Sequence, residues 1–203
     1  MQVASTLTQA DASAIAGAMI WAYQQVTGRS PPSKSSWMMP LAQSAFETAN
    51  FSSLYDWNVG FISQPSKSQP YFYRGSNPVP FAVYSTLGQG CIAMLRWLQR
   101  SGSLAGADNN DLGAYSIGLQ KSGYLGNSDA SVYAQYASGI AAEMTRYASV
   151  VPTAYSEGAG STTTSPISIM LAAGIGVGIV AVSTLVAHAM SSKRTRSTRR
   201  SYA

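Results

Sequence analysis

One carboxylate, Glu47, closes an apolar stretch and is followed shortly by an aromatic, glycine-containing turn. The stretch reads Ala42-Gln43-Ser44-Ala45-Phe46-Glu47-Thr48, and the turn reads Trp57-Asn58-Val59-Gly60-Phe61-Ile62. A carboxyl group buried at such a junction is held protonated near neutral pH, because burial disfavours its charged form. A protonated carboxyl is the group that donates a proton to a glycosidic oxygen. Glu47 is therefore the candidate general acid of this chain.

The usual route of glycoside hydrolysis needs a second carboxylate, and few acids are available for that role. The acids ahead of residue 150 are Asp11, Glu47, Asp56, Asp108, Asp111, Asp129 and Glu143. The aspartates at positions 11, 111 and 129 stand at expected helix starts, where N-capping explains them. Glu143 lies among small residues and Arg146, which predicts an exposed position on a helix.

Asp56 is the candidate for the second carboxylate, because it lies beside the aromatic turn and residues 57–107 contain no Asp or Glu. Three routes follow from this inventory. The reaction uses Asp56, uses the acetamido group of the substrate, or uses Glu47 alone as acid and then as base. The single-glutamate route releases an anhydro sugar and adds no water. The acetamido route and the single-glutamate route suit N-acetylated sugars.

Aromatic side chains accompany the acids. They are Tyr55, Trp57, Phe61, Tyr71, Tyr73, Tyr84 and Tyr124. Such rings can stack on pyranose faces, and the same residue types also bury well in a core.

Other catalytic chemistries are excluded by the inventory. The chain has one cysteine, Cys91, and one histidine, His188, which stand in different kinds of segment. Cys–His and Ser–His–Asp catalysis and histidine-rich metal sites therefore have no residues to form them. Cys91 starts an apolar run and is expected in the core. No metal and no cofactor is implied.

Helical spacing of apolar residues predicts a mainly α domain over residues 1–151. Expected helices cover about 11–27, 87–100 and 111–121, and another runs from Trp37 or Pro40 to Asn50. A last helix begins after Asn127 or Ser128 and ends near Val150. Residues 102–110 are expected to form a loop. Residues 57–85 alternate Gly, Pro, Ser and Asn with short aromatic runs, which predicts a small β-lobe built on a hairpin.

The chain after this domain is expected to attach it to a membrane. Residues 152–166 are rich in Ser, Thr and Gly and predict a flexible linker. Residues 167–190 carry no ionised side chain over 24 residues, and a helix of that length spans about 36 Å, enough to cross a bilayer. Gly174 and Gly178 form a G-x-x-x-G motif that would let two such helices pair as a homodimer.

Positive charge is concentrated in the tail, residues 191–203. Five of the thirteen basic residues lie there, so residues 1–190 hold eight basic and eight acidic residues. A neutral body argues against a nucleic-acid-binding domain. The tail is expected on the inner side of the membrane, in contact with anionic lipid or, as the alternative, with nucleic acid.

The motifs taken together resemble the bacterial and phage glucosaminidase family of peptidoglycan hydrolases. Residues 42–48 with 58–62 resemble its Ala-rich helix ending in Glu-Thr and its Asn-x-x-Gly turn. Phe81-Ala82-Val83-Tyr84-Ser85 is similar to its F-x-x-Y segment. Gly123-Tyr124-Leu125 with Asp129 and Tyr133-Ala134-Gln135-Tyr136 resembles its Y-A-T-D segment. The chain departs from the family pattern where Leu125-Gly126 replaces a small residue and Thr.

This resemblance covers roughly residues 10–148 and implies a lysozyme-like α+β fold with Glu47 as the catalytic acid. It implies that Tyr124 is the active-site tyrosine. Substrate-binding residues are then expected around the turn and the hairpin. They are Trp57, Asn58, Gly60, Phe61 and Tyr84.

The expected function is therefore cleavage of peptidoglycan glycan strands by a hydrolase or a lytic transglycosylase. A single C-terminal anchor would hold it in a membrane, either the internal membrane of a phage virion, for wall penetration, or the bacterial envelope, for remodelling or lysis. The alternative is a non-catalytic wall-binding or structural membrane protein with a lysozyme-like fold.

Overall fold

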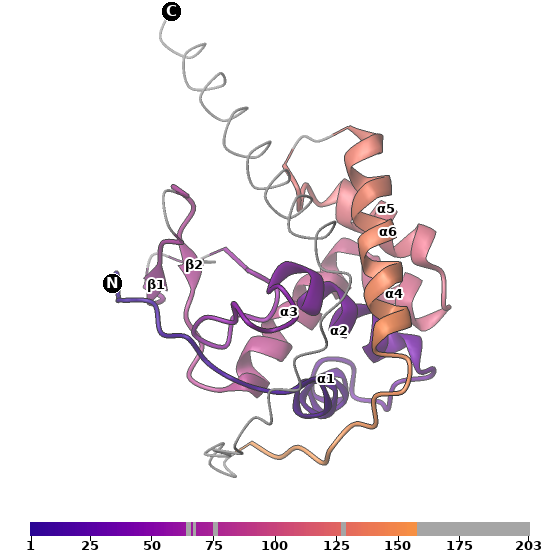
Figure 1. Ribbon diagram of the computed structural model, residues 1–203, viewed down its shortest axis with the longest axis horizontal. Helices are drawn as coiled ribbons and strands as arrows, with labels where there is room; N and C mark the ends of the chain where they lie inside the picture. Colours follow the sequence, from indigo (N-terminus) through magenta and orange to yellow (C-terminus); the bar gives the residue numbers. More distant parts are fainter. Residues whose placement is uncertain (64–65, 67, 75–76, 127–128, 158–203) are drawn as a thin grey trace, which may run out of the picture. The chain divides into compact units, whose positions relative to one another are not determined.

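Helices make up most of the protein in the computed structural model, which describes residues 1–63, 66, 68–74, 77–126 and 129–157 (Figure 1). The helices in these ranges are α1 (Ala12–Thr27), α2 (Ser35–Glu47), α3 (Leu87–Ser101), α4 (Ser103–Asp108), α5 (Leu112–Lys121) and α6 (Ala130–Arg146). Strand β1 (Tyr71–Phe72) pairs antiparallel with β2 (Phe81–Ala82), and Tyr71 faces Ala82 in the register. The prediction of a mainly α domain with a small hairpin is confirmed.

Side-chain caps fix the starts of α1, α5 and α6. Asp11 accepts a hydrogen bond from the backbone N–H of Ala14 at 2.7 Å, and Asp111 accepts one from Ala114 at 2.9 Å. Asp129 accepts hydrogen bonds from the N–H groups of the first turn of α6. These bonds satisfy donors that a helix start leaves without partners, and they confirm the capping role predicted for the three aspartates. Asn127 and Ser128 lie outside the described residues.

Residues 102–110 are not the predicted loop. Gly102, in the left-handed conformation, ends α3 and begins α4 directly. The short helix buries Leu104 and Ala107. A Cβ atom at Gly106 would lie 2.4 Å from the backbone nitrogen of Tyr115, so glycine is required for α5 to pack this closely. Gly106 therefore serves helix packing, and Gly102 supplies the left-handed residue between the two helices.

Helix α2 forms the centre of the domain. It packs against α1, α4 and α6, and its residues 35–46 are all buried. On α6, Gly139 faces Phe46, because a Cβ atom there would lie 2.4 Å from the phenylalanine ring. Glu47 therefore extends from the most buried helix of the fold.

The N-terminal segment, residues 1–8, runs along the β-lobe. The N–H of Val3 donates to the carbonyl of Tyr71 at 2.8 Å, and the N–H of Thr8 donates to the carbonyl of Leu54 at 2.8 Å. In Figure 1 the two strands lie at one side of the unit Met1–Ser156 and α4, α5 and α6 at the other. The N-terminal segment thus bonds both to strand β1 and to the chain at Leu54.

The segment after α6 returns across α1 and α3. The N–H of Thr153 donates to the carbonyl of Ser13 at 3.1 Å, and the hydroxyl of Tyr155 accepts a hydrogen bond from the N–H of Gly88 at 2.8 Å. A Cβ atom at Gly17 would lie 1.9 Å from the carbonyl oxygen of Thr153. The compact unit therefore extends to Ser156, five residues beyond the predicted boundary at residue 151.

The predicted membrane anchor lies outside the described residues. This applies to residues 158–166 of the linker, to the 167–190 helix with Gly174 and Gly178, and to the basic tail. Within the ranges given above, no helix is long and apolar enough to cross a membrane.

Candidate active site

Glu47 is the last residue of α2, and its side chain is half-buried. The helix ends here because the Thr48 hydroxyl donates to the Ser44 carbonyl at 2.7 Å, and because the next three residues take the left-handed conformation. The hydroxyl of Tyr136, on α6, donates to Glu47 Oε1 at 2.5 Å. The contact between α2 and α6 thus holds the carboxyl group in one orientation.

Two more tyrosines and a glutamine surround this pair. The rings of Tyr124 and Tyr136 are 6.0 Å apart. The Tyr124 hydroxyl also lies close enough to Gln43 and Glu47 to interact with them. Tyr115, fully buried, donates a hydrogen bond to Oε1 of Gln43. Glu47 therefore borders a network of polar groups carried by α2, α5, α6 and the loop before α6.

The environment favours the protonated carboxyl. Burial raises the pKa of Glu47 above its ordinary value, while Tyr136, Tyr124 and the positive charge of Arg74 act in the opposite direction. The negative end of the α2 dipole acts in the same direction as burial. Burial and the charge of Glu47 raise the pKa of the Tyr124 and Tyr136 hydroxyls well above the ordinary tyrosine value. Both hydroxyls therefore keep their protons as hydrogen-bond donors.

The turn of the β-lobe approaches this network through Gly60. The Tyr124 hydroxyl donates to the Gly60 carbonyl at 2.8 Å. Asn58 is fully buried and fixes the turn, since its amide nitrogen donates to the carbonyls of Ile62 and Ala82, each at 2.9 Å. Its amide oxygen accepts from the N–H of Ile62 at 2.7 Å. Asn58 therefore shapes the site through the backbone.

The other predicted substrate-binding residues keep part of their surface exposed. Trp57 and Phe61 lie in left-handed conformations on either side of the turn, and both are half-buried. Tyr84 is half-buried beside Gly90, where an added Cβ would lie 1.8 Å from the Trp57 carbonyl oxygen. Burial raises the pKa of Tyr84 to about 12. All seven aromatic residues singled out in the sequence remain at least partly exposed.

The structure gives Asp56 a different setting from Glu47. Its buried carboxylate accepts a hydrogen bond from the N–H of Thr6, with both oxygens at 3.2 Å. Burial raises the pKa of Asp56, and the bonds from Thr6 lower it. Among the described residues, the groups that act on the Glu47 charge are two tyrosines and Arg74, with no second carboxylate. Asp56 anchors the N-terminal segment.

Glu143 was predicted to be exposed, and this prediction is wrong. Its side chain is 2% exposed, and Oε2 lies 3.3 Å from a guanidinium nitrogen of Arg146. Burial raises the pKa of Glu143, and Arg146 lowers it. Glu143 lies seven residues after Tyr136, which places both on the face of α6 that packs on α2.

Three residues of the site were missed in the sequence. Tyr136 has the helical spacing of a core residue, and no local signal directs its hydroxyl to Glu47. Trp97, half-buried on α3, lies 4.8 Å from the Tyr124 ring between centroids. Arg74 lies over the ring of Phe61. Trp97 adds an accessible aromatic face next to the predicted tyrosine.

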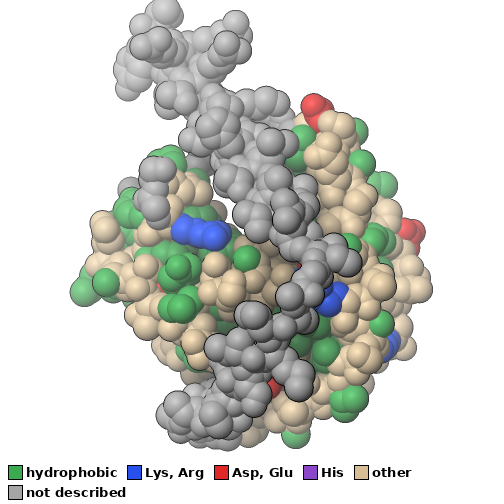
Figure 2. All heavy atoms as spheres, in the orientation of Figure 1, with side chains coloured by type: hydrophobic (Ala, Val, Ile, Leu, Met, Phe, Trp, Pro, Cys, Tyr) green, Lys and Arg blue, Asp and Glu red, His purple; other side chains and the backbone are tan. Residues whose placement is uncertain are grey.

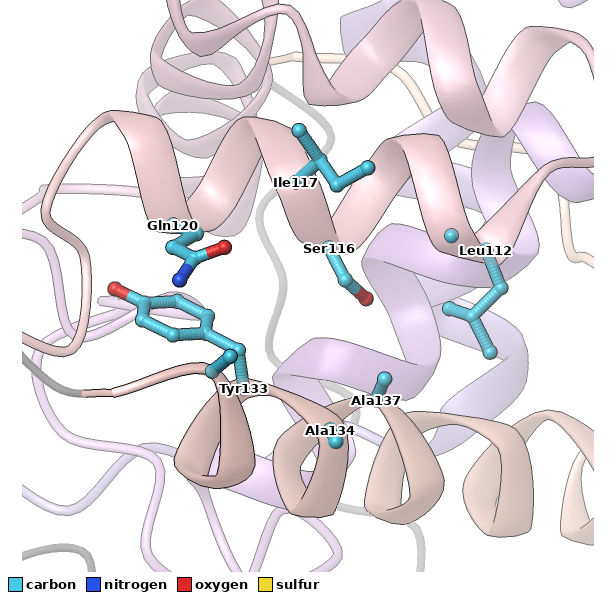
Figure 3. A pocket seen from close by; sticks show the side chains of 9 residues that line it. Leu112, Ser116, Ile117, Gln120, Tyr133, Ala134 and Ala137 are labelled. Atoms are coloured by element: carbon cyan, nitrogen blue, oxygen red, sulfur yellow. The ribbon is translucent and has the colours of Figure 1, made fainter.

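A hollow lies between α5 and α6 (Figure 3). Its volume is about 360 Å³, and its lining includes Leu112, Ser116, Ile117 and Tyr133. The lining is mostly apolar, and it includes neither Glu47 nor Tyr124.

Comparison of the chain with profiles of known protein families, with curated proteins and with solved structures found no match. The resemblance to the glucosaminidase family therefore stays a prediction. The functional argument rests on the residues described above.

Proposed function

We propose that this protein is a glycosidase that cleaves the glycan strands of peptidoglycan between N-acetylated sugars, with Glu47 as the proton donor. One observation carries the proposal. The Glu47 carboxyl is half-buried, its pKa is raised by burial, and Tyr136 orients it. A carboxyl with these properties keeps its proton to higher pH than an exposed glutamate and remains partly accessible to a substrate.

In the first step Glu47 gives its proton to the glycosidic oxygen, and the bond between that oxygen and the anomeric carbon breaks. Glu47 becomes a carboxylate as the proton leaves. The Tyr136 hydroxyl, already 2.5 Å from Oε1, then stabilises a full negative charge. The hydrogen bond is stronger in the transition state than in the ground state, which is the requirement for catalysis.

The second step needs a nucleophile, and the setting of Asp56 favours a route with one carboxylate. Asp56 is buried and bound to Thr6, so it is not placed to activate a water. In the route we favour, the Glu47 carboxylate takes a proton from a hydroxyl of the same sugar. That oxygen bonds to the anomeric carbon, and an anhydro sugar leaves. Glu47 regains its proton, so the cycle closes without a second acid.

The arrangement of the domain supports this proposal. The helical body supplies Glu47, Tyr124 and Tyr136, and the β-lobe supplies Phe61 and Arg74. The exposed surface in the view of Figure 2 is mostly hydrophobic or uncharged polar, with few charged side chains. A lysozyme-like fold and a membrane tether through residues 167–190 remain part of the proposal. The tether would hold the enzyme in a virion membrane or in the bacterial envelope.

The test is digestion of purified peptidoglycan by the full chain in detergent, beside Glu47→Gln, with mass spectrometry of the products. Anhydro ends made only by the wild type are the expected result. Reducing ends made only by the wild type would keep the glycosidase and replace the single-carboxylate route by hydrolysis. A folded wild type that binds the wall and makes no products would instead establish the non-catalytic wall-binding alternative.

A further inference from the structure

Arg74 is a cation in the β-lobe that forms no ion pair among the described residues. Its guanidinium lies 4.5 Å from the centroid of the Phe61 ring, and its side chain is exposed. The ion pairs in the described part of the chain involve Arg29 and Arg146. The sequence from 57 to 107 offers Arg74 no nearby acid either, because it contains no Asp or Glu.

A continuous set of contacts leads from Arg74 to the proposed proton donor. Phe61 follows Gly60, whose carbonyl accepts the Tyr124 hydroxyl at 2.8 Å. The rings of Tyr124 and Tyr136 are 6.0 Å apart, and Tyr136 donates to Glu47 at 2.5 Å. Arg74 is also close enough for its charge to act on the Glu47 carboxyl.

This placement works against the acid function of Glu47. A positive charge lowers the pKa of a nearby carboxyl and so reduces the fraction that carries a proton at neutral pH. The contact with the Phe61 ring places the guanidinium beside the site. Its N–H groups can bind an anion, and a flat guanidinium matches the two oxygens of a carboxylate. A role in binding substrate accounts for an exposed arginine at a place where its charge opposes proton donation.

We propose that Arg74 binds a carboxylate of the substrate next to the sugar that Glu47 protonates, and so directs the enzyme to acidic glycans. This inference rests on the proposed function. Peptidoglycan offers such a carboxylate on its attached peptides, and on its lactyl ether groups wherever the peptide is absent. Neutral polymers of N-acetylglucosamine offer none.

The test compares cleavage of three substrates by the full chain in detergent. They are intact peptidoglycan, glycan strands freed of peptide, which expose the lactyl carboxylate, and the same strands with that carboxylate converted to a methyl ester. The variant is Arg74→Met. Arg29→Met is the matched control, since Arg29 also lies over an aromatic ring, that of Tyr23, at 5.8 Å.

Arg74→Met should lose on the order of tenfold or more in kcat/KM on substrates with a carboxylate, the effect of removing one charge-assisted contact. It should cleave the methyl ester no more slowly than the wild type, because loss of the Arg74 charge also favours the protonated Glu47. Arg29→Met should match the wild type on all three. A loss confined to intact peptidoglycan would assign the carboxylate to the peptide, and a loss on freed strands would assign it to the lactyl group. An equal loss on the ester and the acid would overturn the inference.

Binding to Glu47→Gln separates this inference from the proposed function. If the wild type cleaves nothing, the proposed function fails. Tighter binding of freed strands than of their methyl esters, lost in the Glu47→Gln, Arg74→Met double variant, would then still support Arg74 as the carboxylate-binding residue. Equal binding of acid and ester would overturn it.

Discussion

Replacing Tyr136 with phenylalanine removes one hydroxyl from the site and keeps the ring that packs against Phe46, 5.3 Å away between centroids. A hydrogen bond to a charged group contributes about 1.5–3 kcal/mol. Glu47 becomes charged only as it gives up its proton, so most of this energy is lost from the transition state. At about 1.4 kcal/mol per factor of ten, the rate of glycan cleavage should fall by about 10- to 150-fold.

The pH dependence gives a second readout with a definite sign. The bond from Tyr136 lowers the pKa of Glu47. Its loss therefore raises that pKa, and the alkaline limb of the pH–activity profile should move to higher pH in Tyr136→Phe. Tyr23→Phe is the matched control, since its hydroxyl donates to the Asp108 carboxylate at 2.8 Å, outside the site. It should leave both the rate and the profile unchanged.

Either of two results would refute this reasoning. The first is a folded Tyr136→Phe protein that cleaves at the wild-type rate, which would show that the bond does not stabilise the transition state. The second is an alkaline limb that moves to lower pH, which would mean that the titrating group is not a carboxyl stabilised by this donor.

Three further predictions concern stability and the second acid. Burial raises the pKa of Glu47, so the folded state loses stability as pH rises above about 4.3, the pKa of an unfolded glutamate. In urea unfolding, Glu47→Gln should therefore be more stable than the wild type at neutral pH. Below pH 4 it should be no more stable than the wild type. Asp56→Ala removes the acceptor of the Thr6 N–H and should cost about 1–3 kcal/mol in the same assay. The Asp56→Ala variant should cleave glycan at the wild-type rate per folded molecule. A lower rate would indicate that Asp56 is a catalytic group. Gly139→Ala places a Cβ atom 2.4 Å from the Phe46 ring and should destabilise the domain by about 1–3 kcal/mol. An unchanged midpoint of urea unfolding would show that α2 and α6 separate easily.

The parts of the fold that were predictable from sequence are those fixed by neighbours along the chain. Asp11, Asp111 and Asp129 cap the first turns of their own helices, and Thr86 caps α3 by accepting from the N–H of Gln89 at 3.2 Å. A cap is a contact over two or three residues, so its signal is local. The same holds for the left-handed glycine that ends α1.

The arrangement around Glu47 depends on contacts between distant residues, which one sequence does not specify. Tyr136 and Glu47 are 89 residues apart, and Tyr124 and Gly60 are 64 apart. The burial of Glu143 likewise depends on packing between helices that one sequence does not specify. Its charge suggested exposure, while its spacing from Tyr136 on α6 places it on the buried face. The nearby Arg146 makes that burial tolerable, and the burial itself becomes visible only when α6 packs on α2.

The left-handed turn after Glu47 connects backbone strain with access to the carboxyl. Ala49, Asn50 and Phe51 have φ values of 50°, 56° and 66°, a conformation that costs about 1–2 kcal/mol for an ordinary residue. Side chains three and four positions apart are neighbours on a helix, so a longer α2 would place Asn50 and Phe51 beside Glu47. The turn carries them away, and Arg146 and Tyr147 hold it through the Asn50 side chain. The turn therefore keeps these two side chains away from the carboxyl, and backbone strain of this kind is in keeping with the role proposed for Glu47.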